Sequence, residues 1–289
     1  MADQRQSDLD RQVVWHAFTQ MADYQPFVIE QADGCELIDT DGNRYLDGVS
    51  SLWCNLHGHN HPKINAAIIE QLQRVAHVTS LGVSNPTTVR LAARLVEISP
   101  DGLNHVFFSS DGASSVEVAL KMAFQYWRQC EHPRPEKNLF VALGRAYHGD
   151  TLGSVSVGGV ARFHQMFAPL LFEVIHTSIP DSYHLPPGVP CEGACDHYLA
   201  DLEQILAEHH QRTAAVIIEP LVQGAAGMVM HPPGYLAGVR RLASKYNVLM
   251  IADEVAVGFG RTGTMFACQQ EQVSPDLLCL AKGLTGGYM

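Results

Sequence analysis

The fold of this chain is decided by the stretch YLAGVRRLASKYNVLMIAD, residues 235–253. Apolar residues recur at helical spacing over 235–246, and the run VLMIAD (248–253) that follows is almost entirely apolar. Helical spacing predicts an amphipathic helix, and a continuous apolar run is typical of a strand whose two faces are both covered. The stretch therefore predicts a helix that leads directly into a buried strand of a parallel sheet.

Similar apolar runs alternate with helical patterns from about residue 80 onward. Further helices are expected at about 114–129 and around 202–206. This alternation is typical of parallel βαβ units in an α/β fold. The expected strands are HVFF (105–108), NLFVAL (138–143), FEVIH (172–176), AAVIIE (214–219), VLMIAD (248–253) and LLCLA (277–281).

The first 80 residues have a different pattern. VIEQADGCELIDTDGNRYLDG (28–48) alternates apolar and polar residues and contains Asp-Gly pairs, which predicts a small antiparallel hairpin. We therefore expect an N-terminal segment of a small domain at 1–80 and a large α/β domain at 81–289. The chain ends at Met289, just after a glycine-rich stretch, and this ending indicates a large domain that is incomplete at its C-terminus.

Composition excludes several classes of protein. With 46% apolar and 17% charged residues, the 289-residue chain is neither disordered, collagenous nor a coiled coil. Its net charge of −11 disfavours nucleic acid or an anionic membrane surface as a partner. No apolar run reaches the ~18–20 residues of a membrane span, and the polar start MADQRQSDLDRQ contains no signal-peptide core. A cytoplasmic protein is expected.

The seven cysteines are scattered, which indicates reduced thiols rather than a disulfide framework. One cluster contains Cys191, Cys195 and His197. Its C-x3-C-x-H spacing fits no common zinc pattern, so a surface loop is expected there and no metal site.

A candidate anion site lies in FFSSDGASSVEVALKMA (107–123), where a short run of small residues precedes a helix. Gly112 and Ala113 would let the backbone approach a phosphate, which the free N–H groups of a helix N-terminus attract. The segment matches neither G-x-G-x-x-G nor the Walker pattern, and an ordinary capped helix would look the same.

Two charged side chains follow apolar runs. Asp253 is at the end of VLMIAD, where a carboxylate needs a cationic partner or a metal, or else caps the next turn. Lys282 follows LLCLA among glycines. A partly desolvated lysine is a nucleophile toward carbonyls. Pyridoxal phosphate requires an anion site, a carboxylate for its ring nitrogen and an amine for its aldehyde. Tyr147, after NLFVAL, is the candidate for stacking on the ring, although an isolated Tyr-His-Gly is more often a structural turn.

Seven segments in this order resemble the class III pyridoxal-phosphate aminotransferases, and the resemblance covers essentially all of 11–289. Within that family, the sequences of these segments most resemble the branch that converts 8-amino-7-oxononanoate to 7,8-diaminononanoate in biotin biosynthesis. The segments are WHAFTQM (15–21), DGVSSLWCNLHGHNHP (47–62), SSDGASSVEVALKMAFQYW (109–127), AYHGDTLGSVSVG (146–158), IIEPLVQGAAGM (217–228), IADEVAVGFGRTG (251–263) and LCLAKGLTGGY (278–288).

The resemblance implies a fold type I transferase, with a mixed, mostly parallel sheet flanked by helices and a small N-terminal α+β segment. It implies that Lys282 bonds to the cofactor aldehyde and then moves a proton, and that Asp253 keeps the ring nitrogen protonated. By the same resemblance, Gly112 and Ala113 bind the phosphate through main-chain N–H groups, and Tyr147 covers the ring and borders the substrate.

For the substrate, the resemblance implies a pocket that includes Phe18, Leu52, Trp53 and Tyr147. Many members that use S-adenosylmethionine as amino donor have a tyrosine where this chain has Phe18 and a tryptophan where it has Leu52. A hydroxyl for the donor amine and an aromatic face for the sulfonium are therefore missing. The donor is S-adenosylmethionine or lysine. Glu219 is at the place of a family pocket carboxylate, or is a buried structural acid.

Two other functions compete with this one. The first is a different class III ω-aminotransferase, although Ala256 stands where ornithine and aminobutyrate types are expected to have glutamine. The second is a non-catalytic fragment, because the family continues beyond the cofactor lysine and takes substrate- and phosphate-binding residues from that region. The partners implied are small molecules, a donor and a keto acceptor, and a second copy of the chain in a homodimer of the full-length protein.

Overall fold

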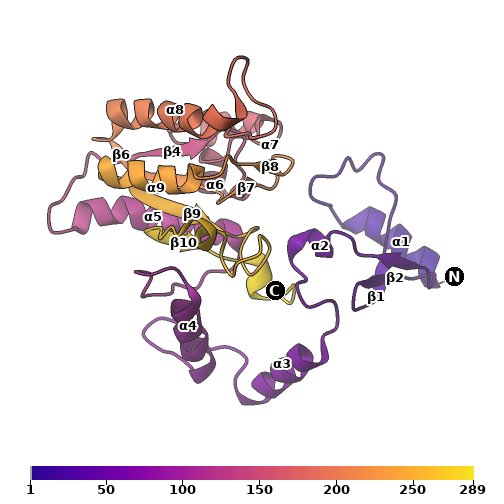
Figure 1. Cartoon of the computed structure of the whole chain (residues 1–289). Coiled ribbons are helices and arrows are strands. Elements are labelled where there is room, and N and C mark those ends of the chain that lie inside the picture. Colours follow the sequence, from indigo (N-terminus) through magenta and orange to yellow (C-terminus); the bar gives the residue numbers. More distant parts are fainter. Residues whose placement is uncertain (1) are drawn as a thin grey trace. The chain divides into compact units, whose positions relative to one another are not determined.

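A computed structural model describes residues 2–289, and the side chains of residues 6–162 and 165–289. The chain forms two compact units (Figure 1). Unit 1 contains the residues up to Val83 together with Thr285–Met289, and unit 2 is Ser84–Leu284. Among the described residues, no helix combines the length and apolarity that crossing a bilayer requires.

The core of unit 2 is a five-stranded sheet in the order β10-β9-β6-β4-β5, and all four neighbouring pairs are parallel. Five of the six predicted strands are confirmed, and an α/β fold with a parallel sheet is thereby confirmed. The strands are β4 (Leu139–Leu143), β5 (Val174–Thr177), β6 (Thr213–Ile218), β9 (Leu249–Asp253) and β10 (Leu277–Cys279).

The strand predicted at 105–108 is wrong, because these residues form no helix or strand. Phe107 is 64% exposed and Phe108 37% exposed, so the apolar sequence is not buried as a central strand would be. A strand exists only through the hydrogen bonds of a neighbour, and no described strand pairs with this segment.

Helices cover both faces of the sheet, as Figure 1 shows. Helix α5 (Gly112–Gln129) covers one face, and α8 (Ala194–His209) and α9 (Tyr235–Lys245) cover the other. Side chains alternate along each strand, which explains why the strands are apolar throughout. Phe140, Ala215 and Ile251 pack in the cluster of α5, whereas Val141, Val216 and Met250 pack in the cluster of α8 and α9.

The strand order places a switch point in the middle of the sheet. From β4 the chain first adds β5 on one side and later adds β6, β9 and β10 on the other side. The connections leaving β4 and β6 therefore diverge at their carboxyl ends. In open α/β sheets, ligands bind in the crevice that this divergence leaves.

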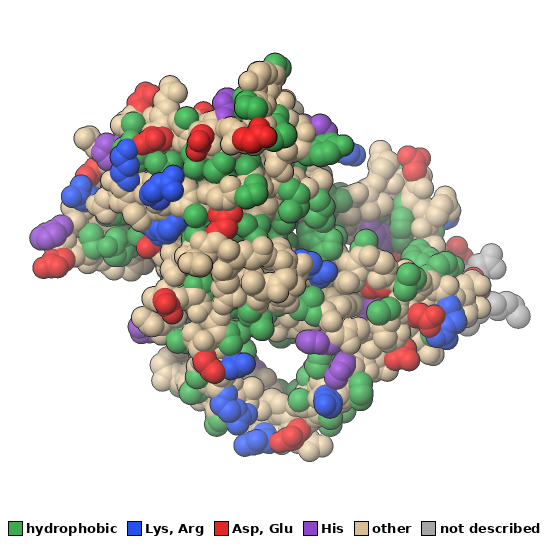
Figure 2. Space-filling view, in the orientation of Figure 1, with side chains coloured by type: hydrophobic (Ala, Val, Ile, Leu, Met, Phe, Trp, Pro, Cys, Tyr) green, Lys and Arg blue, Asp and Glu red, His purple; other side chains and the backbone are tan. Residues whose placement is uncertain are grey.

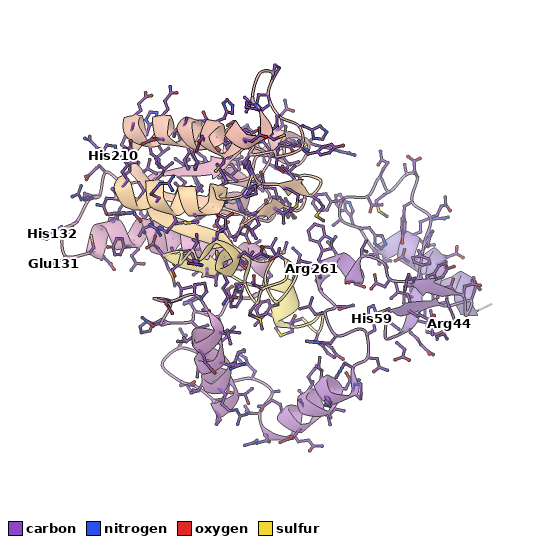
Figure 3. All side chains as sticks on the ribbon, viewed as in Figure 1. Arg44, His59, Glu131, His132, His210 and Arg261 are labelled. Carbon is purple, nitrogen blue, oxygen red and sulfur yellow. The ribbon has the colours of Figure 1, made fainter. Side chains whose placement is uncertain are left out.

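The amino end of the sheet contains a buried lysine. Lys137 is 1% exposed, and its Nζ donates to the carbonyl oxygens of His210, Thr213 and Asn247 at 2.7, 2.8 and 2.9 Å. His210 is the C-cap of α8, where carbonyl groups lack helical partners, and Asn247 lies two residues beyond the end of α9. Lys137 therefore caps α8 and bonds it to the segments that lead into β6 and β9, and Figure 3 labels His210 at this end of unit 2.

Unit 1 contains the predicted antiparallel hairpin, extended by a third strand in the order β1-β2-β3. Tyr288 also belongs to this unit, and its hydroxyl accepts from His61 N at 2.8 Å and lies 2.7 Å from Asn65 Oδ1. The elements are α1 (Ala2–Val13), β1 (Ile29–Asp33), β2 (Glu36–Asp39), β3 (Arg44–Leu46), α2 (Ser50–Trp53) and α3 (Pro62–Arg74).

The cluster of Cys191, Cys195 and His197 lies on the short helix η2 and the first turn of α8. On the face in Figure 2, acidic and basic side chains are interspersed over α8 and α9. Lys245 of α9 and Glu203 of α8 form an ion pair. The remaining elements are α4 (Pro86–Ile98), α6 (Leu152–Ser156), α7 (Ala161–His164), η1 (Gln165–Leu170), η2 (Cys191–Gly193), β7 (Val222–Gln223), β8 (Val229–Met230), η3 (Ala267–Glu271) and η4 (Lys282–Leu284).

Candidate active site

Asp253 is the last residue of β9, at the carboxyl edge of the sheet, and is 4% exposed. Its Oδ1 accepts a hydrogen bond from Val255 N at 3.0 Å, and its Oδ2 lies 2.7 Å from His148 Nδ1. An ionised carboxylate only accepts, so His148 donates from Nδ1. Asp253 therefore both caps the following turn, as the simpler interpretation predicted, and receives a strong side-chain donor.

His148 is a site residue that the sequence analysis missed. Its side chain is fully buried, and its second ring nitrogen, Nε2, has no hydrogen-bond partner among the described residues. The signal in the sequence was its position in the loop that follows the apolar run of β4, next to Tyr147.

Glu219 follows β6 and is 4% exposed. Its Oε1 accepts from Tyr147 N at 3.1 Å and its Oε2 from Gly224 N at 3.0 Å. Burial raises the pKa of this carboxyl group to about 7, against the opposing influence of His148. Glu219 thus ties the ends of β4 and β6 together at the switch point, and its two bonds to backbone N–H groups fit the structural alternative.

Tyr147 lies beside these groups, immediately after the buried Ala146, and is itself half-buried. Its hydroxyl donates to Asp150 Oδ2 at 2.7 Å. Burial raises the pKa of the hydroxyl, and the bond to Asp150 raises it further. The ring is therefore a neutral, positioned aromatic surface at the carboxyl edge.

The N-terminus of α5 has two open amide groups. Asp111 caps the helix by accepting from Ser114 N at 2.7 Å through its side chain and from Ser115 N at 2.9 Å through its carbonyl. The N–H groups of Gly112 and Ala113 have no acceptor within the described part of the chain. Two adjacent free donors at the positive end of an 18-residue helix form a cradle for an anion.

This cradle lies against the other loops of the carboxyl edge. A Cβ on Gly112 would lie 2.7 Å from Val255 Cγ1 and 3.4 Å from the Cβ of Ala281. A Cβ on Gly149 would overlap Ala113. Only a residue without a side chain fits at Gly112 and Gly149, because the loops after β4, β9 and β10 converge on the start of α5.

Lys282 follows β10 and begins η4. Cys279 pairs with Asp253 across the sheet, and Glu254 N donates to the Cys279 carbonyl at 2.9 Å. Lys282 is half-buried, has a left-handed φ of 40°, and directly follows the residue that approaches Gly112. The structure thus brings the backbone segments of the predicted amine, carboxylate and anion cradle to one edge.

The predicted substrate residues lie in unit 1, where each is described with that unit. Phe18 is 69% exposed with a φ of 52°, Leu52 is 64% exposed, and Trp53 is half-buried. All three positions have left-handed backbone angles.

A parallel sheet with an amine, a carboxylate and an anion cradle converging at its carboxyl edge defines a class of cofactor-dependent transferases. The family model of aminotransferase class III matches residues 18–289. The chain therefore belongs to the class III aminotransferase family.

Curated relatives show which members it resembles. The adenosylmethionine-8-amino-7-oxononanoate aminotransferase of Nitratidesulfovibrio vulgaris is 53% identical over 99% of this chain and 53% of its own length. The enzyme of that name from Geobacter sulfurreducens is 50% identical over 98% of this chain and 63% of its own length. The chain thus spans between half and two thirds of the length of these relatives.

Solved structures agree on the fold. The adenosylmethionine-8-amino-7-oxononanoate aminotransferase of Methanocaldococcus jannaschii matches with a TM-score of 0.90 and 41% identity, over 99% of this chain and 64% of that one. An (S)-enantioselective omega-transaminase from Thermomicrobium roseum matches with a TM-score of 0.93 and 37% identity, over 99% of this chain and 64% of that one. The fold is that of a pyridoxal-phosphate-dependent transaminase.

The residues of this chain fit pyridoxal phosphate, the cofactor of class III aminotransferases. Two unpaired backbone donors at Gly112 and Ala113 suit a phosphate, and a buried carboxylate at Asp253 suits a protonated ring nitrogen. A side chain at position 112 would clash with Val255, and its absence keeps the two backbone donors accessible.

Proposed function

We propose that the protein transfers an amino group to the keto group of 8-amino-7-oxononanoate and releases 7,8-diaminononanoate, a step of biotin biosynthesis. The observation that carries the proposal is the convergence of the Gly112–Ala113 cradle, Asp253 and the Lys282 loop at one edge of the sheet. Relatives near 50% identity that are named for this reaction supply the substrate class.

In this proposal, each residue has a role that its surroundings support. The Gly112 and Ala113 amides bind the cofactor phosphate, Asp253 holds a proton on the ring nitrogen, and Tyr147 packs on the ring. Lys282 binds the cofactor and moves a proton at the substrate carbon that bears the amine. When bound, the cofactor supplies the carbonyl that receives the amino group and the ring that withdraws electrons.

Phe18, Leu52 and Trp53 contact the substrates in this proposal. Phe18 lacks a hydroxyl and Leu52 lacks an aromatic face. A hydroxyl group would hold the amine of S-adenosylmethionine, and an aromatic face would hold its sulfonium. We therefore propose S-adenosylmethionine or lysine as the donor, and the choice rests on these two positions.

A turnover assay with the full-length gene product tests the assignment. Purified enzyme with cofactor is offered 8-amino-7-oxononanoate with either S-adenosylmethionine or lysine, and diaminononanoate is measured. Product with one donor is expected, and no product with either donor would overturn the biotin assignment. Lys282→Ala serves as the control, because it removes both the activity and the yellow absorbance band of the bound cofactor.

A second candidate is another ω-transaminase, which the likeness to the Thermomicrobium roseum enzyme favours. An amine panel with pyruvate as acceptor separates the two, since a biotin-pathway enzyme needs the oxononanoate. A third candidate is a non-catalytic fragment, for which the yellow absorbance band of the bound cofactor is not expected. We further propose that the protein acts in the cytoplasm and, when full-length, as a homodimer.

A further inference from the structure

A carboxylate joins the helices α5 and α6 of unit 2. Glu117, in the second turn of α5, accepts a hydrogen bond through Oε1 from Gly153 N at 2.6 Å and a longer one from Ser154 N at 3.4 Å. Gly153 and Ser154 are the second and third residues of α6, where N–H groups have no partner within the helix. A side chain of one helix therefore supplies the acceptor that the first turn of the other helix lacks.

The residue at the start of α6 does not supply this acceptor. Thr151 is the N-cap of α6, and the oxygen of an N-cap threonine commonly accepts from the first N–H groups of a helix. The Thr151 hydroxyl forms no such bond and donates instead to Ser154 Oγ at 3.1 Å. Gly153 is buried, and a Cβ there would overlap the carboxylate of Glu117. The absence of a side chain at Gly153 therefore makes room for the carboxylate of Glu117.

Two further contacts join the same segment to the first turn of α5. Ser154 Oγ donates to the Ala113 carbonyl at 3.2 Å. Gly149 has a φ of 121°, and a Cβ on it would overlap Ala113. Ala113 and Glu117 are four positions apart in the helix, so they lie on the same face of α5. This face therefore contacts residues 149–154 along the first two turns of the helix.

These contacts link two parts of the proposed cofactor site. Ala113 carries one of the two open amide groups of the anion cradle. Residues 149–154 closely follow Tyr147, whose hydroxyl donates to Asp150 of that segment at 2.7 Å. A displacement of the segment along α5 would therefore displace the Tyr147 ring relative to the cradle. Such displacements matter, because a shift of about 1 Å at an active site can change a rate about 100-fold.

We propose that Glu117 is a positioning residue of the cofactor site, which holds the segment 149–154 and the Tyr147 ring in a fixed place relative to the Gly112–Ala113 donors. The inference rests on the cofactor site of the proposed function and is independent of the keto acceptor. A second negative charge near a phosphate is repelled, so the useful property of Glu117 is its acceptor oxygen and not its charge.

Cofactor binding to the full-length protein, first freed of cofactor, tests this role. Glu117→Ala leaves Gly153 N without its acceptor, and we expect the dissociation constant of pyridoxal phosphate to rise about tenfold. The circular dichroism of the absorbance band of the bound cofactor should change as well, because it depends on the asymmetric surroundings of the ring. Glu117→Gln keeps an acceptor oxygen on a side chain of the same size and should restore both wild-type values.

Glu271→Ala is the matched control. Glu271 accepts from Gly234 N at 2.7 Å and from Ala237 N at 2.8 Å, so it too is a carboxylate that bonds the start of another helix, α9. Glu271→Ala and Glu117→Ala should both lower the melting temperature. Only Glu117→Ala should change the dissociation constant of the cofactor and the circular dichroism of its band.

Gly153→Ala tests the contact from the other side. The added Cβ overlaps the Glu117 carboxylate, so this variant should raise the dissociation constant of the cofactor as Glu117→Ala does. In the Glu117→Ala background the carboxylate is absent and alanine is the better helix former, so Gly153→Ala should then change the dissociation constant by less than about twofold. Effects that multiply in the double variant would contradict a shared contact.

The outcomes separate this inference from the function on which it rests. Wild-type cofactor affinity and dichroism in Glu117→Ala would overturn the positioning role. So would a Glu117→Gln variant as impaired as Glu117→Ala, or an equal loss of affinity in Glu271→Ala, because either result shows a general loss of packing. A wild-type protein that binds the cofactor and does not convert 8-amino-7-oxononanoate overturns the biotin assignment alone, whereas one that binds no cofactor overturns both.

Discussion

The two ends of the sheet in unit 2 both contain buried charge, but they satisfy it differently. At the amino end, Lys137 uses all three of its protons on carbonyl oxygens. At the carboxyl end, His148 Nε2 has no partner among the described residues, and the Gly112 and Ala113 amides have none either. Complete bonding is typical of a group that stabilises the fold, whereas buried polar atoms left open point to a ligand.

The pKa directions add to this contrast. Burial lowers the pKa of Lys137 to about 8, and three carbonyl acceptors favour its protonated form. Burial raises the pKa of Glu219 to about 7, where a small change of surroundings alters its charge. The difference teaches that substitutions at the amino end should change stability, and substitutions at the carboxyl end should change activity.

The largest effect is expected from Asp253→Asn. An amide keeps the size of the side chain but cannot hold a proton on the ring nitrogen of the cofactor, so kcat should fall by a factor on the order of a thousand. Steady-state rates with oxononanoate measure this, and the melting temperature should change little. Asp101→Asn, on the exposed surface, is the control. Activity retained within tenfold would contradict the role of Asp253.

Lys137→Met should produce the converse result at the other end of the sheet. The variant leaves three buried carbonyl groups without a donor, and the free energy of unfolding should fall by about 4 kcal/mol. Denaturant unfolding measures it, and the rate per folded molecule should stay the same. Lys245→Met breaks only an exposed pair with Glu203 and should cost under about 1 kcal/mol. An equal loss of unfolding free energy in the two variants would contradict the stabilising role of the three hydrogen bonds of Lys137.

Glu219→Gln tests the carboxyl end through pH. The carboxyl pKa is about 7 in the fold against an ordinary value of 4.5, so the folded state retains a proton that the unfolded state releases between these values. The contribution of Glu219 to stability is then greatest below pH 4.5 and falls by about 3 kcal/mol as pH rises to 7. In Glu219→Gln that fall should disappear, whereas the exposed Glu131→Gln, labelled in Figure 3, should keep it. If the free energy of unfolding depends on pH in the same way in Glu219→Gln and wild type, the raised pKa of Glu219 is refuted.

The sequence predicted the five strands of the central sheet. An apolar run such as 139–143 or 249–253 indicates a strand that is buried on both faces. The same reasoning failed at 105–108, since burial also needs a pairing strand that a local pattern does not reveal. The segments of Asp253 and Lys282 could be predicted to meet, because each follows a parallel strand and the carboxyl ends of parallel strands share one edge.

Two features of the structure could not be predicted. His148 follows an apolar run like many structural residues, and its importance lies in a contact with Asp253 that is 105 positions away. None of the residues of α2 (Ser50–Trp53) is glycine, so local propensity does not predict their left-handed backbone angles. Asp47 Oδ1 accepts a hydrogen bond from Ser51 N in this turn. A long-range contact decides the place of His148, whereas the contact between Asp47 and Ser51 spans only four positions.

The smallest effect is expected at His148, where two variants separate position from charge. His148→Ala removes the donor to Asp253 Oδ2 and leaves a buried carboxylate short of one hydrogen bond, so kcat/KM should fall about tenfold. His148→Asn places an amide N–H near the position of Nδ1 and should restore most of that loss, which a simple packing defect would not allow. The dissociation constant of the cofactor should follow the same order, with Ala weaker than Asn. If both variants lose activity equally while their melting temperatures match the wild type, the hydrogen bond between His148 and Asp253 has no part in the reaction.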